Sequence, residues 1–425
     1  MTIENLHTLF LESTGISTDT RKIIKGNLFF ALKGENFDGN VFSEKAIELG
    51  ASFSVIDDEK YFVDQKTILV DNVLKTLQNL ANFHRNYLNL PIIALTGSNG
   101  KTTTKELIHT VLKEKYNTIA TQGNLNNHIG VPLTLLTMNN DTEIGIVEMG
   151  ANHQGEIAFL CEIAQPDYGY ITNFGKAHLE GFGGVEGVIK GKSEMYVYLR
   201  KNNKKAFINN EDTLQIEKAL SIQSFSFGTK NSSPDVIVEL VEANPFLKID
   251  YSSTTIESKL IGTYNFSNIA AAISIGAYFK VPSSAIKKGI ESYTPANNRS
   301  QIIKKVSNTI ILDAYNANPS SMYVALENFN QLQNKNKTVI LGDMFELGKD
   351  AAIEHQQIVD LSESLGFNQV FLIGKNFFNT KSKSSHKFES FDDFKTFLKK
   401  NKFENSQILI KGSRGMALER VLDLI

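Results

Sequence analysis

A glycine-containing loop between an apolar segment and a helix-like segment is the strongest chemical signal in the sequence. It reads Thr96-Gly-Ser-Asn-Gly-Lys-Thr-Thr-Thr104. The backbone N–H groups of such a loop, with the helix N-terminus behind them, can surround a phosphate. Lys101 would neutralise the β- and γ-phosphates, and the Thr102 hydroxyl would bind Mg²⁺. Leu95 replaces the first glycine of the strict pattern, so a turn with a solvated lysine is the alternative, but the strand–loop–helix context favours nucleotide binding.

Two more polar residues follow predicted strands. Glu148 lies at the end of the apolar run Gly145-Ile-Val-Glu-Met149, and His178 follows the run 168–172. The carboxyl ends of parallel strands face the ligand crevice, where an acidic residue can hold Mg²⁺. Taken alone, such an acid is more often a solvated strand end, and a lone loop histidine is more often a surface or packed residue. Next to a phosphate loop, a metal ligand becomes the favoured interpretation of Glu148.

The first 88 residues predict a small α/β domain. Turn-forming residues separate short apolar runs, and the 73–87 segment has apolar residues at helical spacing. Strands are expected over 27–32 and 52–56, and helices over 43–49 and 73–87.

Residues 89–296 predict a central domain with a mostly parallel sheet, like that of P-loop ATPases. Fully apolar runs alternate with helical segments, which is typical of a parallel sheet covered on both faces. Alternating apolar residues within 221–258 predict antiparallel strands attached to that sheet, and a helix over 265–277 closes the domain. The other expected elements are strands over 92–95, 143–149 and 168–172 and a helix over 101–116.

Residues 297–425 predict a second doubly wound unit, a Rossmann-like C-terminal domain. Strands are expected over 309–313, 338–341, 370–373 and 407–410, and helices over 320–333, 351–365 and 391–401. The predicted fold class is therefore α/β with three domains.

Composition narrows the function classes. The chain has 425 residues, 41% of them hydrophobic, and a formal net charge of −2, so it lacks the basic excess of a nucleic-acid binder. Cys161 is the single cysteine, so no intrachain disulfide can form. The first residues have no signal-peptide pattern, and no segment is apolar enough to predict membrane insertion. We expect a cytoplasmic protein, and a monomer.

Five motifs, taken together and in this order, resemble those of the Mur ligases, the ATP-dependent amide-forming enzymes of peptidoglycan precursor synthesis. The N-terminal segments Ser17-Thr-Asp-Thr-Arg21 and Gly26–Gly39 resemble the UDP-binding domain shared by the ligase that adds the third residue and the ligase that adds D-alanyl-D-alanine to a UDP-N-acetylmuramoyl-tripeptide. The C-terminal motifs Gly342–Gly348 and Lys411–Gly415 resemble those of the second of these two members. The five motifs are Thr96–Thr103, Gly123-Asn-Leu-Asn-Asn127, Glu148-Met-Gly-Ala151, Ile171–His178 and Gly191-Lys-Ser-Glu-Met-Tyr196.

The resemblance implies a catalytic set of Lys101, Glu148, His178 and Lys192. ATP would phosphorylate the peptide carboxylate, and the incoming amine would attack the resulting acyl phosphate. Thr102 and Glu148 would hold one Mg²⁺. Glu148, His178 and a carbamylated Lys192 would hold the second, because CO₂ converts a repelling ammonium into an oxygen-donor anion. A surface lysine is the alternative for Lys192, and Lys190 is a lesser candidate.

The resemblance also implies nucleotide contacts. Residues of both the middle and the last domain take part. The alternative for Asn265 and Asn268 is helix capping, and the alternative for Asp313 is a solvated strand end. Asn298 replaces the glycine that usually precedes the family arginine. The implied residues are Gly97, Ser98, Asn99, Gly100, Lys101, Thr102, Thr103, Asn265, Asn268, Arg299 and Asp313.

The substrate contacts implied by the resemblance divide among the three domains. Asn126 and Asn127 are expected near the muramoyl-peptide end, and Asn316 and Arg414 near D-alanyl-D-alanine. The uridine-diphosphate end is assigned to Thr20, Lys33, Asp38 and Gly39. The alternatives are the ligase that adds the third residue, a folylpolyglutamate synthetase and a P-loop switch that performs no ligation. The third residue of the tripeptide, diaminopimelate or lysine, stays open.

Overall fold

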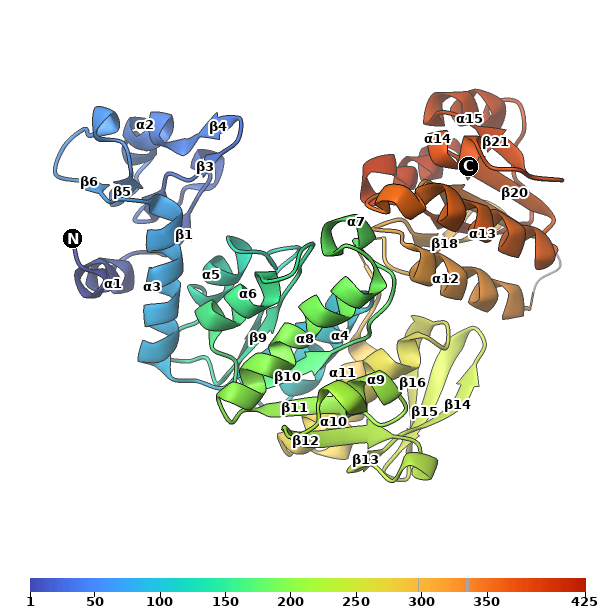
Figure 1. Cartoon of the computed structure of the whole chain (residues 1–425), viewed down its shortest axis with the longest axis horizontal. Helices are drawn as coiled ribbons and strands as arrows, with labels where there is room; N and C mark the ends of the chain where they lie inside the picture. The colour runs from blue at the N-terminus through green and yellow to red at the C-terminus, as the bar shows by residue number, and fades with distance from the viewer. Residues whose placement is uncertain (297, 334–335) are drawn as a thin grey trace.

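The computed structural model describes residues 1–296, 298–333 and 336–425. Three α/β domains follow one another, with the middle domain between the N-terminal and C-terminal ones (Figure 1). This confirms the predicted fold class. Residue 297, where the sequence analysis begins the last domain, lies outside the described residues.

The N-terminal domain is built on a small parallel sheet in the order β1-β2-β5-β6, with a β3–β4 hairpin beside it. The long helix α3 (Val73–Leu88) leads to the middle domain. The Asn72 side chain caps its first turn, and Asn89, in the left-handed conformation, ends it. The remaining elements are α1 (Ile3–Glu12), β1 (Ile16–Ser17), β2 (Leu28–Phe30), β3 (Lys33–Gly34), β4 (Phe37–Asp38), α2 (Ser43–Glu48), β5 (Phe53–Ile56) and β6 (Thr67–Leu69).

The middle domain contains a seven-stranded parallel sheet in the order β13-β12-β11-β10-β7-β9-β8. The chain runs from β7 towards one edge through β8 and β9, then crosses to β10 on the other side of β7, so the loop after β7 lies at the switch point where ligands bind in such sheets. The strands are β7 (Ile92–Thr96), β8 (Thr118–Ala120), β9 (Ile144–Glu148), β10 (Tyr168–Ile171), β11 (Lys205–Asn209), β12 (Gln223–Gly228) and β13 (Val236–Ile237).

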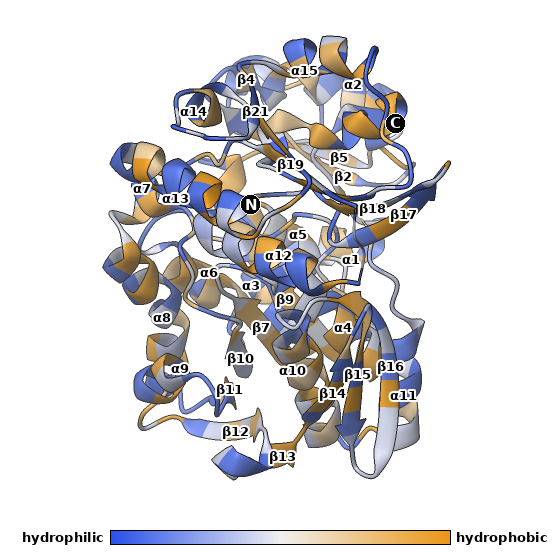
Figure 2. Ribbon diagram, turned by 90° about the vertical axis from the view of Figure 1, so that its right-hand side faces the viewer, coloured by the Kyte–Doolittle hydropathy of each residue, from blue (hydrophilic) through white to orange (hydrophobic). Residues whose placement is uncertain are grey.

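Helices cover this sheet on both faces. The apolar helix α10 (Asn265–Tyr278) packs beside α4 (Lys101–Leu112), and Figure 2 shows the apolar colouring of α10 and β7. The middle-domain helices α4 and α10 are accompanied by α5 (Gly130–Leu135), α6 (Glu156–Ala164), α7 (Leu179–Phe182), α8 (Val185–Lys201), α9 (Thr213–Lys218) and α11 (Ser283–Ser292).

The antiparallel part of the middle domain differs from the prediction. Residues 223–228 and 236–237 form β12 and β13, which pair in parallel within the main sheet. The antiparallel strands begin at β14 (Glu239–Ala243) and form a separate sheet with β15 (Phe246–Tyr251) and β16 (Thr254–Ile261). Alternation is strongest in β16, where one face is buried and the other solvated, whereas two-residue β13 is too short to reveal its pairing from periodicity.

The C-terminal domain has a six-stranded sheet in the order β17-β18-β22-β19-β20-β21. All its strands are parallel except the edge strand β17, which forms a hairpin with β18. The elements are β17 (Gln301–Lys305), β18 (Asn308–Asp313), α12 (Pro319–Gln331), β19 (Lys337–Gly342), α13 (Ala351–Ser364), β20 (Gln369–Ile373), α14 (Lys375–Phe378), β21 (His386–Phe388), α15 (Phe391–Leu398) and β22 (Gln407–Lys411).

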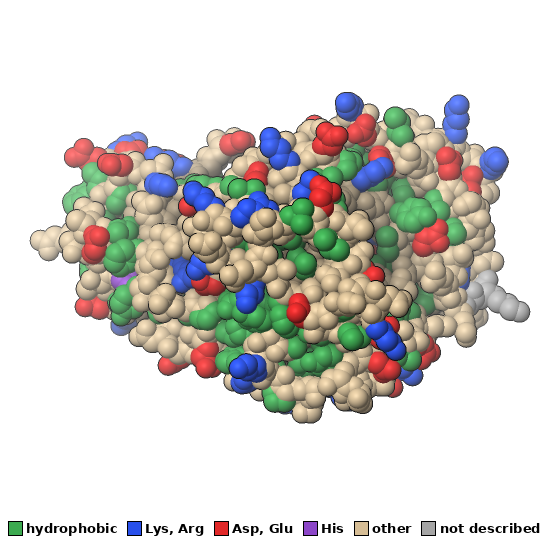
Figure 3. Space-filling model, turned by 60° about the horizontal axis from the view of Figure 1, so that its bottom comes forward, with side chains coloured by type: hydrophobic (Ala, Val, Ile, Leu, Met, Phe, Trp, Pro, Cys, Tyr) green, Lys and Arg blue, Asp and Glu red, His purple; other side chains and the backbone are tan. Residues whose placement is uncertain are grey.

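The surface carries both signs of charge. On the face in Figure 3, lysine and arginine side chains are interspersed with aspartate and glutamate, in keeping with the near-zero net charge. Among the described residues, no helix combines the length and apolarity needed to cross a bilayer.

Candidate active site

The glycine loop wraps tightly between β7 and α4. Gly97 and Gly100 both have positive φ, 140° and 79°. A β-carbon at Gly97 would lie 2.0 Å from Thr172 Oγ1, and one at Gly100 would lie 2.6 Å from Asn268 Oδ1. Glycine is therefore required at both positions by conformation and by space. Ser98 and Asn99 are held by neighbours, since Ser98 Oγ donates to Gly175 O at 2.7 Å.

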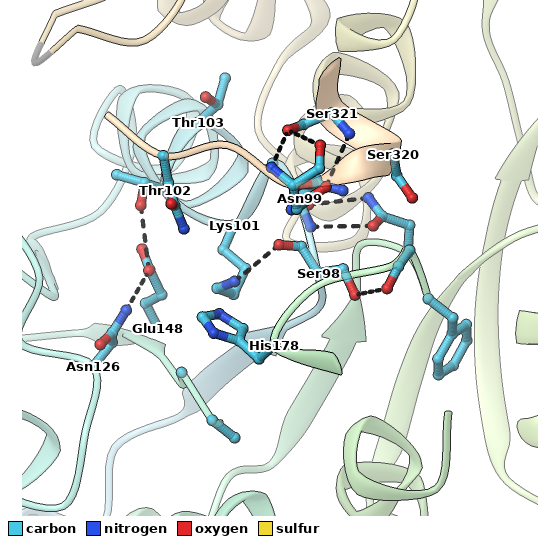
Figure 4. Close-up of a pocket in the computed structure, with 18 of the residues that line it drawn as sticks. Ser98, Asn99, Lys101, Thr102, Thr103, Asn126, Glu148, His178, Ser320 and Ser321 are labelled. Carbon is cyan, nitrogen blue, oxygen red and sulfur yellow. Dashed lines mark hydrogen bonds between the residues drawn. The ribbon is translucent and has the colours of Figure 1, made fainter. Parts of the chain in front are cut away.

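A pocket of about 1230 Å³ opens over this loop, between the middle and C-terminal domains. Figure 4 shows Lys101, Glu148 and His178 directed into it from three different strand-end segments. The carboxyl ends of β7 and β9 are aligned, with Leu95 paired to Glu148. The parallel sheet thus brings the sequence-predicted groups to one edge.

Lys101 is the cation that the phosphate loop itself brings into the pocket. Its ammonium folds back to donate to the carbonyl oxygen of Gly97 at 2.7 Å. Burial lowers the pKa of Lys101, and the nearby charge of Glu148 opposes that shift. A phosphate in the loop would give this ammonium a stronger partner than a backbone carbonyl.

Glu148 is buried at the end of β9, with two donors on the same oxygen. Its Oε1 accepts from Thr102 Oγ1 at 3.2 Å and from Asn126 Nδ2 at 2.8 Å. The other oxygen, Oε2, is buried and has no hydrogen-bond partner among the described residues. A carboxylate oxygen left unpaired beside a hydroxyl is suited to a divalent cation, because Mg²⁺ prefers oxygen ligands. These residues therefore fit the metal that the family resemblance implies, although the described residues contain no group of three His, Cys, Asp or Glu arranged around one ion.

His178 lies just before α7 with a left-handed backbone, φ 53°. Its Nδ1 forms a hydrogen bond with Oε2 of Glu346, which comes from the C-terminal domain. This contact lowers the pKa of Glu346 and keeps its carboxylate ionised. The structure therefore places His178 in the pocket and gives it an acidic partner that sequence analysis did not identify.

Lys192 lies on α8 and, unlike Lys101, Glu148 and His178, is not among the residues that line the pocket. Its side chain is buried, its ammonium donates to Ala151 O at 3.1 Å, and it lies 5.0 Å from the centre of the Phe182 ring. Burial lowers the pKa of Lys192 well below its usual value, and the charge of Lys101 adds to the shift. Lys190 is exposed on the same helix, so the alternative of a surface lysine describes Lys190 rather than Lys192.

Asn265 and Asn268 line the pocket behind the loop. Asn268 Nδ2 donates to Asn265 Oδ1 at 2.8 Å, and Asn268 Oδ1 accepts from Thr104 Oγ1 at 3.0 Å. The first turn of α10 has no side-chain cap, so helix capping does not explain these asparagines. They join α10 to the phosphate-loop helix α4.

The C-terminal domain contributes its own charged wall. Arg299 stacks on the Tyr315 ring, 3.6 Å from its centre, and its buried Nε has no hydrogen-bond partner among the described residues. Asp313 accepts from the backbone N–H of Ser300 at 3.1 Å and pairs with Lys411 at 2.5 Å. Asp313 is therefore not a free strand end.

The predicted substrate residues are distributed unevenly. Asn126 and Asn316 line the pocket, whereas Asn127 also caps the turn before α5 by accepting from the N–H groups of Ile129 and Gly130. Arg414 is exposed, with its nearest acidic partner, Glu419, at 3.5 Å.

The residues assigned to the uridine-diphosphate end lie in the N-terminal domain. Lys33 and Asp38 face each other across the β3–β4 hairpin, and Lys33 is paired with Asp57 at 2.8 Å. A β-carbon at Gly39 would lie 2.5 Å from Leu32 O, so this glycine is required by close packing. Thr20 is on a separate short helix, Thr20–Lys22.

Sequence reasoning missed Glu346, Tyr315 and Lys411 as pocket residues. All three line the pocket and contact a residue that was predicted. Glu346 and Lys411 lie in the C-terminal motifs Gly342–Gly348 and Lys411–Gly415, in which only Arg414 was assigned a contact. The charges of Glu346 and Lys411 within these motifs were the sequence signal that could have identified them as pocket residues.

Comparison with known proteins identifies the family. Three family models match: "Mur ligase family, catalytic domain" over residues 12–85, "Mur ligase middle domain" over 95–276 and "Mur ligase, glutamate ligase domain" over 298–414. The chain is 37% identical to the UDP-N-acetylmuramoyl-tripeptide–D-alanyl-D-alanine ligase of Bacillus subtilis, over 97% of this chain and 93% of that protein.

Solved structures agree. A crystal structure of MurF from Acinetobacter baumannii superposes with a TM-score of 0.87 at 31% identity, covering 100% of this chain and 98% of that one. The MurF ligase of Thermotoga maritima in complex with ADP gives 0.84 at 27% identity, covering 98% and 97%. These matches confirm the resemblance drawn from the motifs: the chain belongs to the Mur ligase family.

Proposed function

We propose that this Mur ligase adds D-alanyl-D-alanine to a UDP-N-acetylmuramoyl-tripeptide with hydrolysis of ATP to ADP and phosphate. The relatives that match over nearly the whole chain carry this activity in their names, and one is bound to ADP. The observation that carries the proposal is the single pocket in which Lys101, Glu148 and His178 meet across the carboxyl ends of parallel strands.

The chemistry requires anions to be brought together. A carboxylate oxygen of the tripeptide attacks the γ-phosphorus of ATP, and the bond to ADP breaks. The amine of D-alanyl-D-alanine then attacks the acyl carbon, loses a proton and displaces phosphate. Lys101 and the loop N–H groups hold the triphosphate and stabilise the charge that develops on it. Bound Mg²⁺ would neutralise further phosphate charge, with Thr102, Glu148, His178 and Lys192 as its proposed ligands.

Lys192 is proposed to carry a carbamate. Only a neutral amine reacts with CO₂, and the buried surroundings of Lys192 favour the neutral form. The amine nitrogen bonds to the CO₂ carbon and releases one proton, leaving an anionic oxygen donor. The other nucleotide residues are proposed to act as predicted: Gly97, Ser98, Asn99, Gly100 and Thr103 around the phosphates, and Asn265, Asn268, Arg299 and Asp313 around the rest of ATP.

The substrate assignments also stay proposals. Thr20, Lys33, Asp38 and Gly39 are assigned to the uridine-diphosphate end, Asn126 and Asn127 to the muramoyl peptide, and Asn316 and Arg414 to the dipeptide. We propose the boundaries 1–88, 89–296 and 297–425 for the three domains. A cytoplasmic location and a monomeric state remain predictions.

The test is an assay of phosphate release. Release should require both the tripeptide nucleotide and D-alanyl-D-alanine, and ATP hydrolysis that neither substrate stimulates would refute the ligation. Exchanging D-alanyl-D-alanine for single amino acids distinguishes this activity from that of the ligase that adds the third residue. Lys101→Ala should reduce turnover by about 10³-fold or more.

Lys192→Ala tests the carbamate. It should abolish activity, with partial recovery on adding short carboxylic acids that replace the missing anion. The exposed neighbour provides the control, because Lys190→Ala should remain fully active. A Lys192→Ala protein that stays active without rescue would disprove the carbamate.

A further inference from the structure

The two C-terminal motifs interlock into one platform. The N–H of Ser413 donates to Asp343 O at 3.1 Å, and the N–H of Phe345 donates back to Ser413 Oγ at 2.9 Å. The Asp343 carboxylate accepts two N–H groups at the start of α14, both at 2.9 Å. The N–H of Met344 donates to the buried ring of His355 at 3.0 Å. The loop after β19 is therefore held from three sides.

This platform presents Glu346 to His178 across the domain boundary. Both residues have left-handed backbones, with φ of 62° and 53°. Such a conformation costs a non-glycine residue free energy, and it persists where surrounding contacts hold it in place. The contact is reinforced by the N–H of Glu180, which donates to Glu346 O at 3.2 Å. Two strained residues facing each other through their side chains indicate a functional contact.

The hydrogen bond determines the chemical form of the imidazole. An ionised carboxylate can only accept, so His178 Nδ1 must carry the proton that it shares with Glu346. In the neutral ring the lone pair is then on Nε2, the nitrogen left for a metal. Carboxylates that orient metal-binding histidines in this way raise metal affinity. Figure 4 shows the His178 ring directed into the pocket with Lys101 and Glu148.

We propose that Glu346 is a positioning residue for His178: it fixes the tautomer and orientation of the ring, so that the cation site of the middle domain is complete only when the C-terminal domain is docked. The inference rests on the proposed function, in which His178 binds the second Mg²⁺. It adds a cross-domain requirement to that site.

The experiment measures cation affinity directly. Mn²⁺ is titrated into the full-length protein with ADP and bicarbonate present, and free Mn²⁺ is followed by electron paramagnetic resonance. Glu346→Ala should lower the Mn²⁺ affinity of the lower-affinity site by about 10- to 100-fold. Glu346→Gln should weaken it less, because its amide oxygen still accepts from Nδ1. The Glu346 side chain is 52% exposed, so neither substitution leaves a cavity.

A second ion pair across the same two domains provides the matched control. Lys176 bonds Glu354 at 2.6 Å without touching His178, so Glu354→Gln should leave Mn²⁺ affinity unchanged. Equal weakening by Glu354→Gln and Glu346→Ala would overturn positioning in favour of simple docking. If His178→Ala weakens Mn²⁺ binding and Glu346→Ala does not, the positioning role is wrong. If His178→Ala itself has no effect, the metal assignment in the proposed function fails.

Discussion

The middle domain meets its two neighbours through contacts that differ in the placement of their polar groups. Towards the N-terminal domain, α3 packs an apolar stripe against α5, and Leu77, Leu80, Val131 and Leu135 share one buried core. Several polar groups in this contact, among them His84 and Arg85, are buried too. They donate mainly to backbone carbonyls, as His84 does to Met138 O at 2.9 Å.

The contact with the C-terminal domain shares that buried core, which includes Leu179 and Leu347, and it also carries polar groups around the pocket. Asn318 Nδ2 donates to Asn99 Oδ1 at 2.8 Å, directly on the phosphate loop, and Lys176 pairs with Glu354 at 2.6 Å. The Lys176 side chain is 41% exposed. Water can replace partners of this kind at little cost, whereas it cannot replace buried apolar packing.

The two domain contacts therefore differ in how readily they can open. The N-terminal contact is continuous with a buried core and is expected to stay closed. The C-terminal contact surrounds the pocket and is held in part by polar groups that water can satisfy, so it is the better suited of the two to opening for substrates and closing for reaction.

The largest effect should come from the N-terminal contact. Arg85 on α3 is buried, pairs with Asp167 at 2.7 Å and donates to two backbone carbonyls. Arg85→Met should lower the free energy of unfolding by about 3 kcal/mol, since it leaves buried acceptors without a partner. Arg21→Met removes an 87% exposed arginine from a similar pair and should leave the free energy of unfolding nearly unchanged. Urea unfolding measures the loss in free energy of unfolding for each variant. Equal losses in the two variants would contradict a permanently closed contact.

Mild acid should loosen the same contact. His7 Nε2 lies 3.0 Å from His84 Nδ1. Because His84 Nε2 must donate its proton to the carbonyl of Met138, His84 Nδ1 is the acceptor in the pair. An added proton on His84 Nδ1 would place two donors face to face. Burial lowers the pKa of both histidines.

The unfolded chain therefore binds these protons first. Stability is fully present above pH of about 6.5 and falls as the pH drops from there towards the lowered folded pKa, by up to about 1.4 kcal/mol per pH unit for each histidine. Thermal unfolding between pH 7.5 and 5 measures the loss. A His84→Gln variant should show a flatter dependence, and an equally steep one would assign the loss to other groups.

Features that depend on residues adjacent in the sequence were predicted correctly. The turn from Gly97 to Lys101 joins a strand to a helix, and both elements carry their own periodicity, so the motif and its surroundings were predicted together. Glu148 followed from a strand end. The α/β class and the family were confirmed, while the roles of individual site residues stay predictions.

Pairs of side chains that are distant along the chain were not predicted. Asp313 was predicted to contact the ribose or phosphate side of ATP, and its partner was not predicted: Lys411, 98 residues later, lies on the neighbouring strand and pairs with it. The pairing of His178 with Glu346 depends on how two domains dock, which no local pattern encodes. The edge strands β8, β17 and β21 were also missed, because short or edge strands carry little periodicity, and the interior strand β11 was missed as well.

The smallest stability effect, with a distinctive effect on catalysis, should come from Asn318. Its side chain caps α12 by accepting from the N–H of Ser321 at 2.9 Å, and it also donates to Asn99 on the phosphate loop. Asn318→Ala should cost about 1 kcal/mol of stability through the lost cap. It should also reduce kcat by about tenfold through the lost bridge.

A second capping box in the C-terminal domain separates the two effects. Ser390 caps α15 in the same way but lies on a helix that contributes no residue to the pocket. Ser390→Ala should therefore lose similar stability and keep its kcat. If both variants lose activity alike, general loosening of the domain explains the result. If only Asn318→Ala does, the polar contact at the phosphate loop is part of the catalytic closure, because a bond between Asn318 and Asn99 can form only when the two domains meet.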